Sequence, residues 1–177
     1  MGVVRRERWI TMQTGVKVGD AMTQQPITVG AGSSLQRCAK LMEKHKISAV
    51  LVKSGKELGI LTDKDIVRKL VAEGRDPTGM KAKDVMTTVL HTAEPAHDVF
   101  DALMQMGTHD VNHIPVMTNK NLHGILTVKD ILKIQPHLFE ILVDKFEIRE
   151  QEQKLQAMDR KNAETLDVDE EVGELIS

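Results

Sequence analysis

GILTDKDIVRKL, from Gly59 to Leu70, has a near copy later in the chain, GILTVKDILKI, from Gly124 to Ile134. In each copy a short apolar run ends in a threonine, and an aspartate stands three residues after it. A short apolar run predicts a strand, and a polar residue placed just after it predicts the start of a helix, here opened by Asp65 and by Asp130. The chain therefore contains one strand-to-helix unit twice.

The duplication extends to earlier parts of each copy. VGDAMT, residues 18–23, aligns with AKDVMT, residues 82–87, at an offset of 64. The same offset relates two segments with apolar residues at i, i+3, i+4 and i+7, the spacing of an amphipathic helix. These residues are Leu35, Cys38, Ala39 and Met42 in the first copy and Val99, Ala102, Leu103 and Met106 in the second. Ser33 or Ser34 and Asp98 are the predicted helix caps.

Two β-rich runs follow each predicted helix. They are residues 47–52 and 58–62 around the turn KSGKE, and residues 111–117 and 122–127 around TNKN. The offset between Gly59 and Gly124 is 65, so the second copy holds one additional residue, which we assign to its turn.

These elements predict a mixed α/β (α+β) fold of two βαββα repeats. Helices cover only one face of each sheet, so we expect the repeats to bury their other faces against each other, pseudo-symmetrically, and to form two equivalent clefts. The predicted organisation is a flexible arm (1–15), repeat 1 (16–74), repeat 2 (75–134), a C-terminal helix (135–163) and an acidic, disordered tail (164–177).

Composition narrows the classes of function. A single cysteine, Cys38, excludes an internal disulfide and a thiolate zinc cluster, and its place on the helix face predicts a core residue. The net charge of −2 and the scarcity of aromatic residues argue against a nucleic-acid partner. Apolar runs are too short to span a bilayer, and no signal peptide is recognisable, so we expect a cytoplasmic protein without a membrane partner.

Each Thr-x-x-Asp admits two interpretations. Alone, it predicts a capping box, which satisfies helix amides and stabilises by roughly 1 kcal/mol. Over a cleft, the carboxylate can also accept hydrogen bonds from the vicinal hydroxyls of a ribose, while the helix terminus faces a phosphate. Arg68 and Lys133 stand three residues after the two aspartates and offer a cation one turn along.

The ordered set of these motifs resembles a tandem pair of CBS domains, also called a Bateman module, of the stand-alone prokaryotic or archaeal type. The resemblance covers residues 16–134 and rests on DAMTQQPITV, LMEKHKISAVLV and GILTDKDIV, then on DVMT, MQMGTHDVNHIPV and GILTVKDIL. It implies two clefts that bind adenosine-containing ligands such as AMP, ADP, ATP or S-adenosylmethionine, a role in energy sensing, and a homodimer that forms a disc of four repeats.

The resemblance also implies which residues line the clefts. In the first they are Ile27, Thr28, Ile47, Ser48, Ala49, Thr62, Asp65 and Arg68. In the second they are Leu90, Thr92, Val111, Asn112, His113, Pro115, Thr127, Asp130 and Lys133. Asn112 and His113 stand where the first copy has Ser48 and Ala49, and in similar proteins a basic residue there often meets phosphate, so we expect the second cleft to prefer phosphorylated ligands. His109 and His113 span a helix end and a strand, so we expect no metal site and no required cofactor.

Three functions remain open from the sequence. The first is a non-enzymatic regulatory module that binds an adenosyl ligand and relays its occupancy to an unidentified protein partner. An enzyme is disfavoured, because no nucleophile stands with a base at a recognisable spacing and no phosphate loop is present. The alternative is a dimerisation scaffold with unoccupied clefts, which binds protein or nucleic acid through its terminal segments.

Overall fold

The computed structural model describes residues 13–141, 143, 154, 155 and 158. The chain divides into two compact units, Met1–Gln135 and Pro136–Ser177. In the described part of the chain, no helix is both long enough and apolar enough to cross a membrane.

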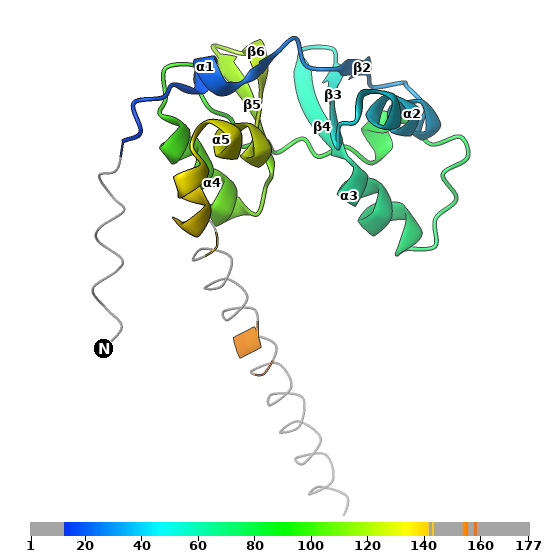
Figure 1. Cartoon of the computed structure of the whole chain (residues 1–177). Helices are drawn as coiled ribbons and strands as arrows, with labels where there is room; N and C mark the ends of the chain where they lie inside the picture. Colours follow the sequence, from blue (N-terminus) through cyan, green and yellow to red (C-terminus); the bar gives the residue numbers. More distant parts are fainter. Residues whose placement is uncertain (1–12, 142, 144–153, 156–157, 159–177) are drawn as a thin grey trace, which may run out of the picture. The chain divides into compact units, whose positions relative to one another are not determined.

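The first copy builds a three-stranded sheet with helices on one face (Figure 1). Strand β2 (Thr28–Gly30) runs parallel to β3 (Ala49–Ser54), which pairs antiparallel with β4 (Glu57–Thr62). Helix α2 (Leu35–His45) connects β2 to β3, and α3 (Asp63–Ile66) follows β4 and continues as a π-helix, η1 (Val67–Val71). This is the predicted order of strand, helix, strand, strand and helix.

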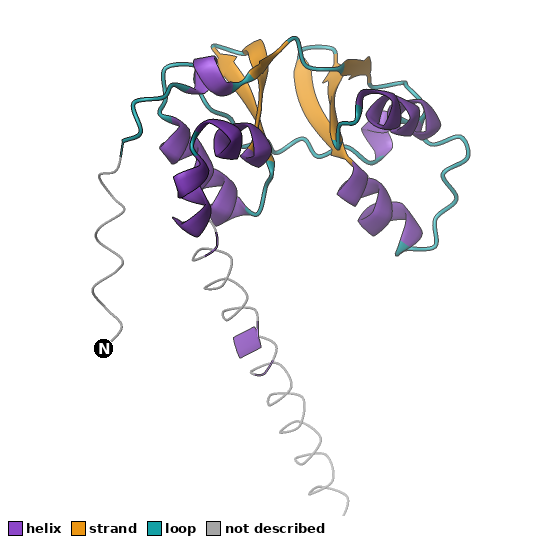
Figure 2. Ribbon diagram, in the orientation of Figure 1, coloured by secondary structure: helices purple, strands orange, loops and turns teal. Residues whose placement is uncertain are grey.

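The second copy repeats this order with one reduction. Helix α4 (Val99–His109), strands β5 (His113–Thr118) and β6 (Asn121–Thr127) and helix α5 (Val128–Ile134) correspond to α2, β3, β4 and α3. The predicted first strand is present only as a single parallel bridge between Ala93 and Val116. Helices and strands of both copies give the mixed α/β fold expected from the sequence (Figure 2).

Local sequence explains where the long helices begin and end. The Ser34 side chain accepts a hydrogen bond from the Arg37 amide, and Asp98 accepts one from the Phe100 amide, so both predicted caps are confirmed, the first at Ser34. Both helices end at a residue in the left-handed region, Lys46 at φ 53° and Asp110 at φ 55°. Cys38 is fully buried and burial raises the pKa of its thiol, as expected of a core residue.

Successive apolar residues of β3 point to opposite faces of the sheet and so belong to two different core clusters. On β3, Val50 and Val52 face the helices with Leu61, whereas Ala49 and Leu51 belong with Ile60 to a second cluster. That second cluster also contains three partly buried residues from the other copy, namely Leu90, Leu122 and Ile125. The two copies therefore bury their sheet faces against each other, as the sequence predicts.

The N-terminal segment of each copy packs on the other copy. Helix α1 (Val18–Ala21) leads into β1 (Thr23–Gln24), which pairs antiparallel with β6 and extends the second sheet to the order β1-β6-β5. Reciprocally, the 3₁₀ turn η2 (Ala82–Asp84) inserts Ala82 into the core of the first copy, and Thr87 bridges to Ile60 of β4. The packed halves are thus not the same stretches of chain as the sequence repeats.

The additional residue of the second copy does not lie in the turn, which corrects the sequence interpretation. Both hairpins have two-residue turns, because Ser54 pairs with Glu57 and Thr118 pairs with Asn121. The register shifts instead between Val116 and Met117, so that His123 is a β-bulge in β6. Asn119 and Lys120 both adopt positive φ, 50° and 68°, which suits a tight hairpin turn.

Thr14 and Gly15 of the predicted arm bond to Asp98 in the second copy. The buried Asp98 carboxylate accepts hydrogen bonds from the Thr14 amide (3.1 Å), the Thr14 hydroxyl (2.8 Å) and the Gly15 amide (2.9 Å). Residues 1–12, which include most of the predicted arm, lie outside the described residues.

In the second unit, Pro136–Leu138 form a 3₁₀ turn, η3, and residues 139–141, 143, 154, 155 and 158 have helical backbone. The rest of that helix and the predicted acidic tail lie outside the described residues.

Candidate functional site

Thr62 and Asp65 form a reciprocal capping box at the junction of β4 and α3. The Thr62 hydroxyl accepts from the Asp65 amide at 3.0 Å, while Oδ2 of Asp65 accepts from the Thr62 amide at 2.9 Å and from the Thr62 hydroxyl at 2.7 Å. The helix begins at Asp63, so Asp65 is its third residue rather than its first. The predicted opening of the helix at the aspartate is therefore wrong by two residues, because the threonine takes the cap position.

The second copy has the same geometry. The Asp130 amide donates to the Thr127 hydroxyl at 3.1 Å, and Oδ2 of Asp130 accepts from the Thr127 amide and hydroxyl at 3.2 and 2.7 Å. Helix α5 likewise begins one residue after the threonine, at Val128. In both copies the capping uses one carboxylate oxygen and leaves Oδ1 for another partner.

The start of the neighbouring strand lies beside each capping box. The Asp63 amide donates to the Ser48 carbonyl at 3.0 Å, and the Val128 amide donates to the Asn112 carbonyl at 3.2 Å. Ala49 is the strand partner of Thr62, and His113 is that of Thr127. The structure thus brings together four predicted residues of the first cleft (Ser48, Ala49, Thr62 and Asp65) and four of the second (Asn112, His113, Thr127 and Asp130).

The carboxylates of Asp65 and Asp130 differ in the hydrogen-bond and ion-pair partners of Oδ1. In the first copy, the Lys69 ammonium lies 2.8 Å from Asp65 Oδ1 and also donates to the Val85 carbonyl (2.8 Å) and the Thr87 hydroxyl (3.0 Å). The Thr87 hydroxyl donates to the same Oδ1 at 3.4 Å. Burial alone would raise the pKa of Asp65, but the hydrogen bonds from Lys69 and Thr62 outweigh it and the pKa is lowered.

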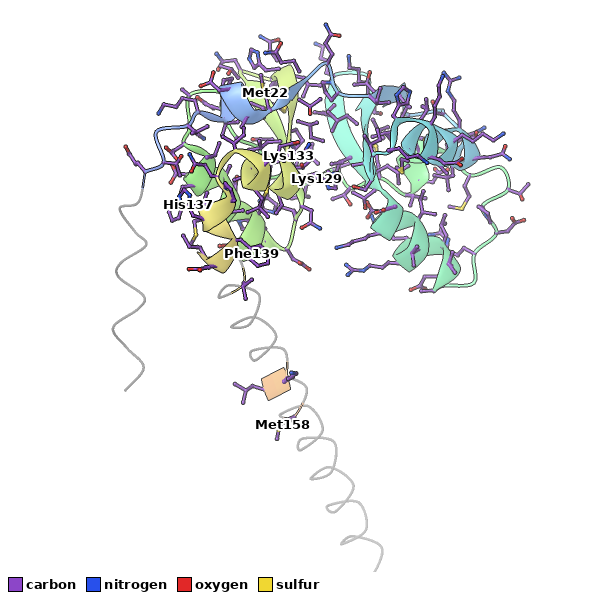
Figure 3. The ribbon with its side chains drawn as sticks, viewed as in Figure 1. Met22, Lys129, Lys133, His137, Phe139 and Met158 are labelled. Carbon is purple, nitrogen blue, oxygen red and sulfur yellow. The ribbon has the colours of Figure 1, made fainter. Side chains whose placement is uncertain are left out.

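Sequence reasoning missed Lys69 and Thr87. It named Arg68, which is exposed, as the cation of the first cleft, and its counterpart Lys133 on α5 is exposed as well (Figure 3). The signal for Thr87 was present in the sequence, because Met-Thr closes both N-terminal motifs, at residues 22–23 and 86–87.

In the second copy the residue equivalent to Lys69 is Ile134, whose side chain cannot donate a hydrogen bond. Oδ1 of Asp130 has no hydrogen-bond or ion-pair partner within the described residues. The second carboxylate is therefore held in place by Thr127 and still has acceptor capacity.

His113 joins the two copies instead of presenting a charge. Its Nε2 lies 2.9 Å from the hydroxyl of Ser48, which precedes Ala49, the residue equivalent to His113 in the first copy. Burial lowers the pKa of His113 further than Asp63 and Asp130 raise it, which favours the neutral ring at pH 7. The expected preference of the second cleft for phosphorylated ligands stays a prediction.

The remaining predicted residues are more scattered. Ile27 and Ile47 pack against the core of the first copy, and Leu90 packs between the sheets. Thr28 lies on β2 opposite Leu51, Pro115 lies on β5 opposite Ile125, and the Val111 amide donates to the Met106 carbonyl. Thr92 is exposed.

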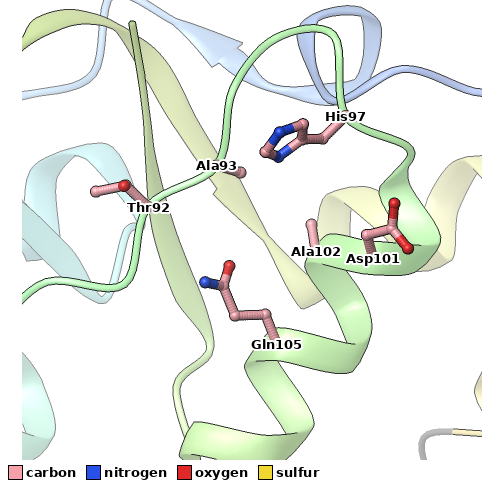
Figure 4. Close-up of a pocket in the computed structure, with 6 residues that line it drawn as sticks. All are labelled: Thr92, Ala93, His97, Asp101, Ala102 and Gln105. Atoms are coloured by element: carbon pink, nitrogen blue, oxygen red, sulfur yellow. The ribbon is translucent and has the colours of Figure 1, made fainter. Parts of the chain in front are cut away.

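Thr92 lines a surface hollow of about 290 Å³ whose lining residues include none of the two capping boxes (Figure 4). Its other lining residues come from the segment before α4 and from α4 itself, namely Ala93, His97, Asp101, Ala102 and Gln105. The hollow shares only Thr92 with the predicted clefts.

His109 and His113, which the sequence does not predict to bind a metal, each contact a different side chain. His109 stacks on His91 with ring centroids 3.7 Å apart, and His113 bonds to Ser48. Within the described residues, no group of three or more His, Cys, Asp or Glu side chains is placed to hold a metal ion.

Comparison with known proteins identifies this architecture. The CBS domain family matches residues 18–72 and 82–137, which together make up more than half of the chain. The chain belongs to the CBS-domain family. The resemblance noted in the sequence is thus confirmed, and the two packed halves are a CBS-domain pair.

Relatives and solved structures agree with the CBS assignment. A CBS domain-containing protein of Bacillus subtilis, YhcV, is 35% identical over 115 residues, covering 64% of this chain and 81% of the relative. The hexameric CBS-CP12 protein from bloom-forming cyanobacteria aligns with a TM-score of 0.60 at 28% identity, covering 66% of this chain and 69% of that chain.

The CBS-domain pair of the protein MJ0100, solved in complex with 5′-methylthioadenosine and S-adenosyl-L-methionine, aligns with a TM-score of 0.61 at 26% identity. The alignment covers 69% of this chain and 97% of that one. For some other curated relatives the chain spans a smaller part, such as 64% of an uncharacterised protein of Methanopyrus kandleri.

Proposed function

We propose that this CBS-domain pair is a non-enzymatic regulatory module that binds an adenosine-containing ligand of the AMP, ADP, ATP or S-adenosylmethionine type. The observation that carries the proposal is the second capping box. There a carboxylate is fixed by its own threonine through Oδ2, and Oδ1 has no partner within the described residues.

The chemistry of this arrangement matches a ribose. Vicinal ribose hydroxyls are two neighbouring donors, and a carboxylate is an acceptor-only group with about four lone-pair sites. Because Thr127 holds the Asp130 carboxylate before any ligand arrives, a ribose would not have to spend binding energy on ordering that side chain. Hydrogen bonds to a charged acceptor contribute about 1.5–3 kcal/mol each.

The comparisons support the choice of ligand class. The structural neighbour MJ0100 carries two adenosyl compounds on its CBS-domain pair. In this chain both Thr-x-x-Asp motifs are intact, with the same capping geometry in each copy.

The proposal extends to the readout. Binding at the junction of β6 and α5 would stiffen the place where α5 begins, and a protein partner would read the change. We further propose that two copies of the chain associate, with the homodimer as the expected assembly.

A thermal-shift screen tests the proposed function. The panel is adenosine, AMP, ADP, ATP, S-adenosylmethionine and 5′-methylthioadenosine, with CMP and GMP as base controls. A ligand at a hundredfold excess over its Kd should stabilise the chain by about 2.7 kcal/mol. A panel in which no adenosyl compound raises the melting temperature more than CMP does would overturn the proposal.

A further inference from the structure

We propose that Lys69 closes the first cleft from within, so that ligand binding by this chain is carried by the second cleft, at Asp130. The inference rests on the proposed function and specifies which of its two clefts is competent. It comes from a difference between two otherwise equivalent positions, Lys69 and Ile134.

The contacts of Lys69 show why the first carboxylate is unavailable. Its ammonium group has three donors, and the structure gives it three acceptors: Asp65 Oδ1, the Val85 carbonyl and the Thr87 hydroxyl. With Oδ2 occupied by Thr62, both oxygens of Asp65 are engaged by groups of the protein. The first cleft already contains the donors that a ribose would supply.

Burial makes this arrangement costly to open. The Asp65 side chain is 15% exposed and that of Lys69 is 40% exposed, so the pair is partly withdrawn from water. A ribose entering the cleft would replace an ammonium group by neutral hydroxyls on the same carboxylate. It would also leave the Val85 carbonyl and the Thr87 hydroxyl without their donor.

Within the part of the chain that the structure describes, the second cleft has no such internal donor. Ile134 is 44% exposed and apolar, and Asp130 Oδ1 keeps its acceptor capacity within the described residues. The other parts of the two boxes match closely, since the threonine hydroxyl donates to the aspartate at 2.7 Å in both. Lys69 at 2.8 Å and the longer contact from Thr87 at 3.4 Å therefore distinguish a satisfied carboxylate from one that retains acceptor capacity.

Isothermal titration calorimetry with AMP on the full chain tests the inference. The wild type should bind about one AMP per chain. Lys69→Ile should bind about two, because Oδ1 of Asp65 loses its ammonium partner and keeps only the 3.4 Å contact from Thr87. Ile134→Lys, the reciprocal exchange at the exposed position, should bind close to none.

Two asparagine substitutions provide a second test that does not require Lys69 to be replaced. Asp130→Asn should weaken the binding of AMP by the wild-type chain at least about tenfold, because it removes a charged acceptor. Asp65→Asn should change it by less than about twofold. Melting curves without ligand identify any variant that does not fold. If Lys69→Ile does not fold, the AMP binding of Ile134→Lys and of the two asparagine variants still decides the result.

The outcomes separate the inference from the proposed function. Two AMP molecules on the wild-type chain, or a Lys69→Ile chain that folds and still binds one, would overturn the inference and leave the function standing. An equal loss for Asp65→Asn and Asp130→Asn would do the same. If neither the wild type nor Lys69→Ile binds AMP or any compound of the adenosyl panel, the proposed function itself fails.

Discussion

At the scale of single residues, the glycine of each GILT motif is explained by the methionine and threonine of the crossing segment. A Cβ on Gly124 would lie 2.6 Å from the Thr23 carbonyl oxygen and 2.7 Å from Met22 Sδ. A Cβ on Gly59 would lie 2.6 Å from Met86 Sδ and 3.2 Å from the Thr87 carbonyl oxygen. Met22 is labelled next to α1 in Figure 3. Each GILT glycine therefore leaves room for a Met-Thr pair from another part of the chain, Met22–Thr23 at Gly124 and Met86–Thr87 at Gly59.

This contact predicts a ranking of three alanine substitutions. Gly124→Ala should lower the free energy of unfolding most, by about 1–3 kcal/mol, because a backbone oxygen cannot move away as a thioether can. Gly59→Ala should cost less, and Gly32→Ala, where a Cβ meets nothing within 4 Å, should cost least. Urea denaturation of the three variants measures the order. Equal losses at Gly124 and Gly32 would contradict the close approach.

Asp98 should make the stability depend on pH. Burial alone would raise its pKa, but hydrogen bonds from Phe100, Thr14 and Gly15 lower it. A lowered folded-state pKa means that the stabilisation is present above the unfolded value, near 3.9, and is lost as the pH falls through the folded value.

We therefore expect Asp98→Asn to destabilise the chain by about 2 kcal/mol at pH 7, because the amide of asparagine opposes a backbone N–H donor in either orientation. The difference from the wild type should shrink as the pH falls below the ordinary range of an aspartate. Denaturation curves at several pH values measure it, and a difference that does not change with pH would contradict the assignment.

The choice between Arg68 and Lys69 shows where local reasoning stops. Both residues stand one turn after Asp65, at i+3 and i+4, and either can reach it on a helix. Lys69 has two additional acceptors, the Val85 carbonyl and the Thr87 hydroxyl, and both come from a segment of the other copy. The sequence predicts that either cation can reach Asp65. Only the folded structure shows that the Val85 carbonyl and the Thr87 hydroxyl lie beside Lys69.

At the scale of elements, periodicity predicts most of the helices and strands because each buries one face against a nearby neighbour. All four predicted apolar positions of α4 are buried. On α2 three of the four are buried, but Ala39 is exposed, so the prediction for that residue is wrong. Strand β1, by contrast, has two residues and no alternation to detect, and its partner β6 lies about a hundred residues away. The exchange of N-terminal segments between the copies could not be predicted from local pattern.

The position of the bulge in β6 can be tested by deleting its extra residue. Removing His123, which is exposed, should give β6 the same pairing as β4, where Lys53 faces Leu58 and Val52 faces Gly59 without interruption. We expect that variant to fold with a change in stability of about 1 kcal/mol or less.

Deletion of Asn119 is the matched control, because it removes half of a two-residue turn and should destabilise the hairpin strongly. Thermal melts compare the two deletions. A larger loss for the deletion of His123 than for that of Asn119 would place the additional residue back in the turn.

At the scale of the whole molecule, two copies of one unit share a sheet-to-sheet core and meet at Ser48 and His113. The duplication allows each capping box to be compared with its counterpart under matched geometry. One box has a carboxylate satisfied by Lys69, and the other has an oxygen with acceptor capacity. The two capping boxes share their backbone geometry and differ in the partners of the carboxylate.

The central claim is that the Asp130 carboxylate binds the hydroxyls of an adenosyl ribose. The affinity of the chain for AMP and for 2′-deoxy-AMP tests it most directly, measured on the wild type and on Asp130→Asn. One hydrogen bond to a charged acceptor is worth about 1.5–3 kcal/mol, so the wild type should prefer AMP by roughly tenfold to a hundredfold. Asp130→Asn should lose most of that preference. Equal affinity of the wild type for the two nucleotides would contradict the account.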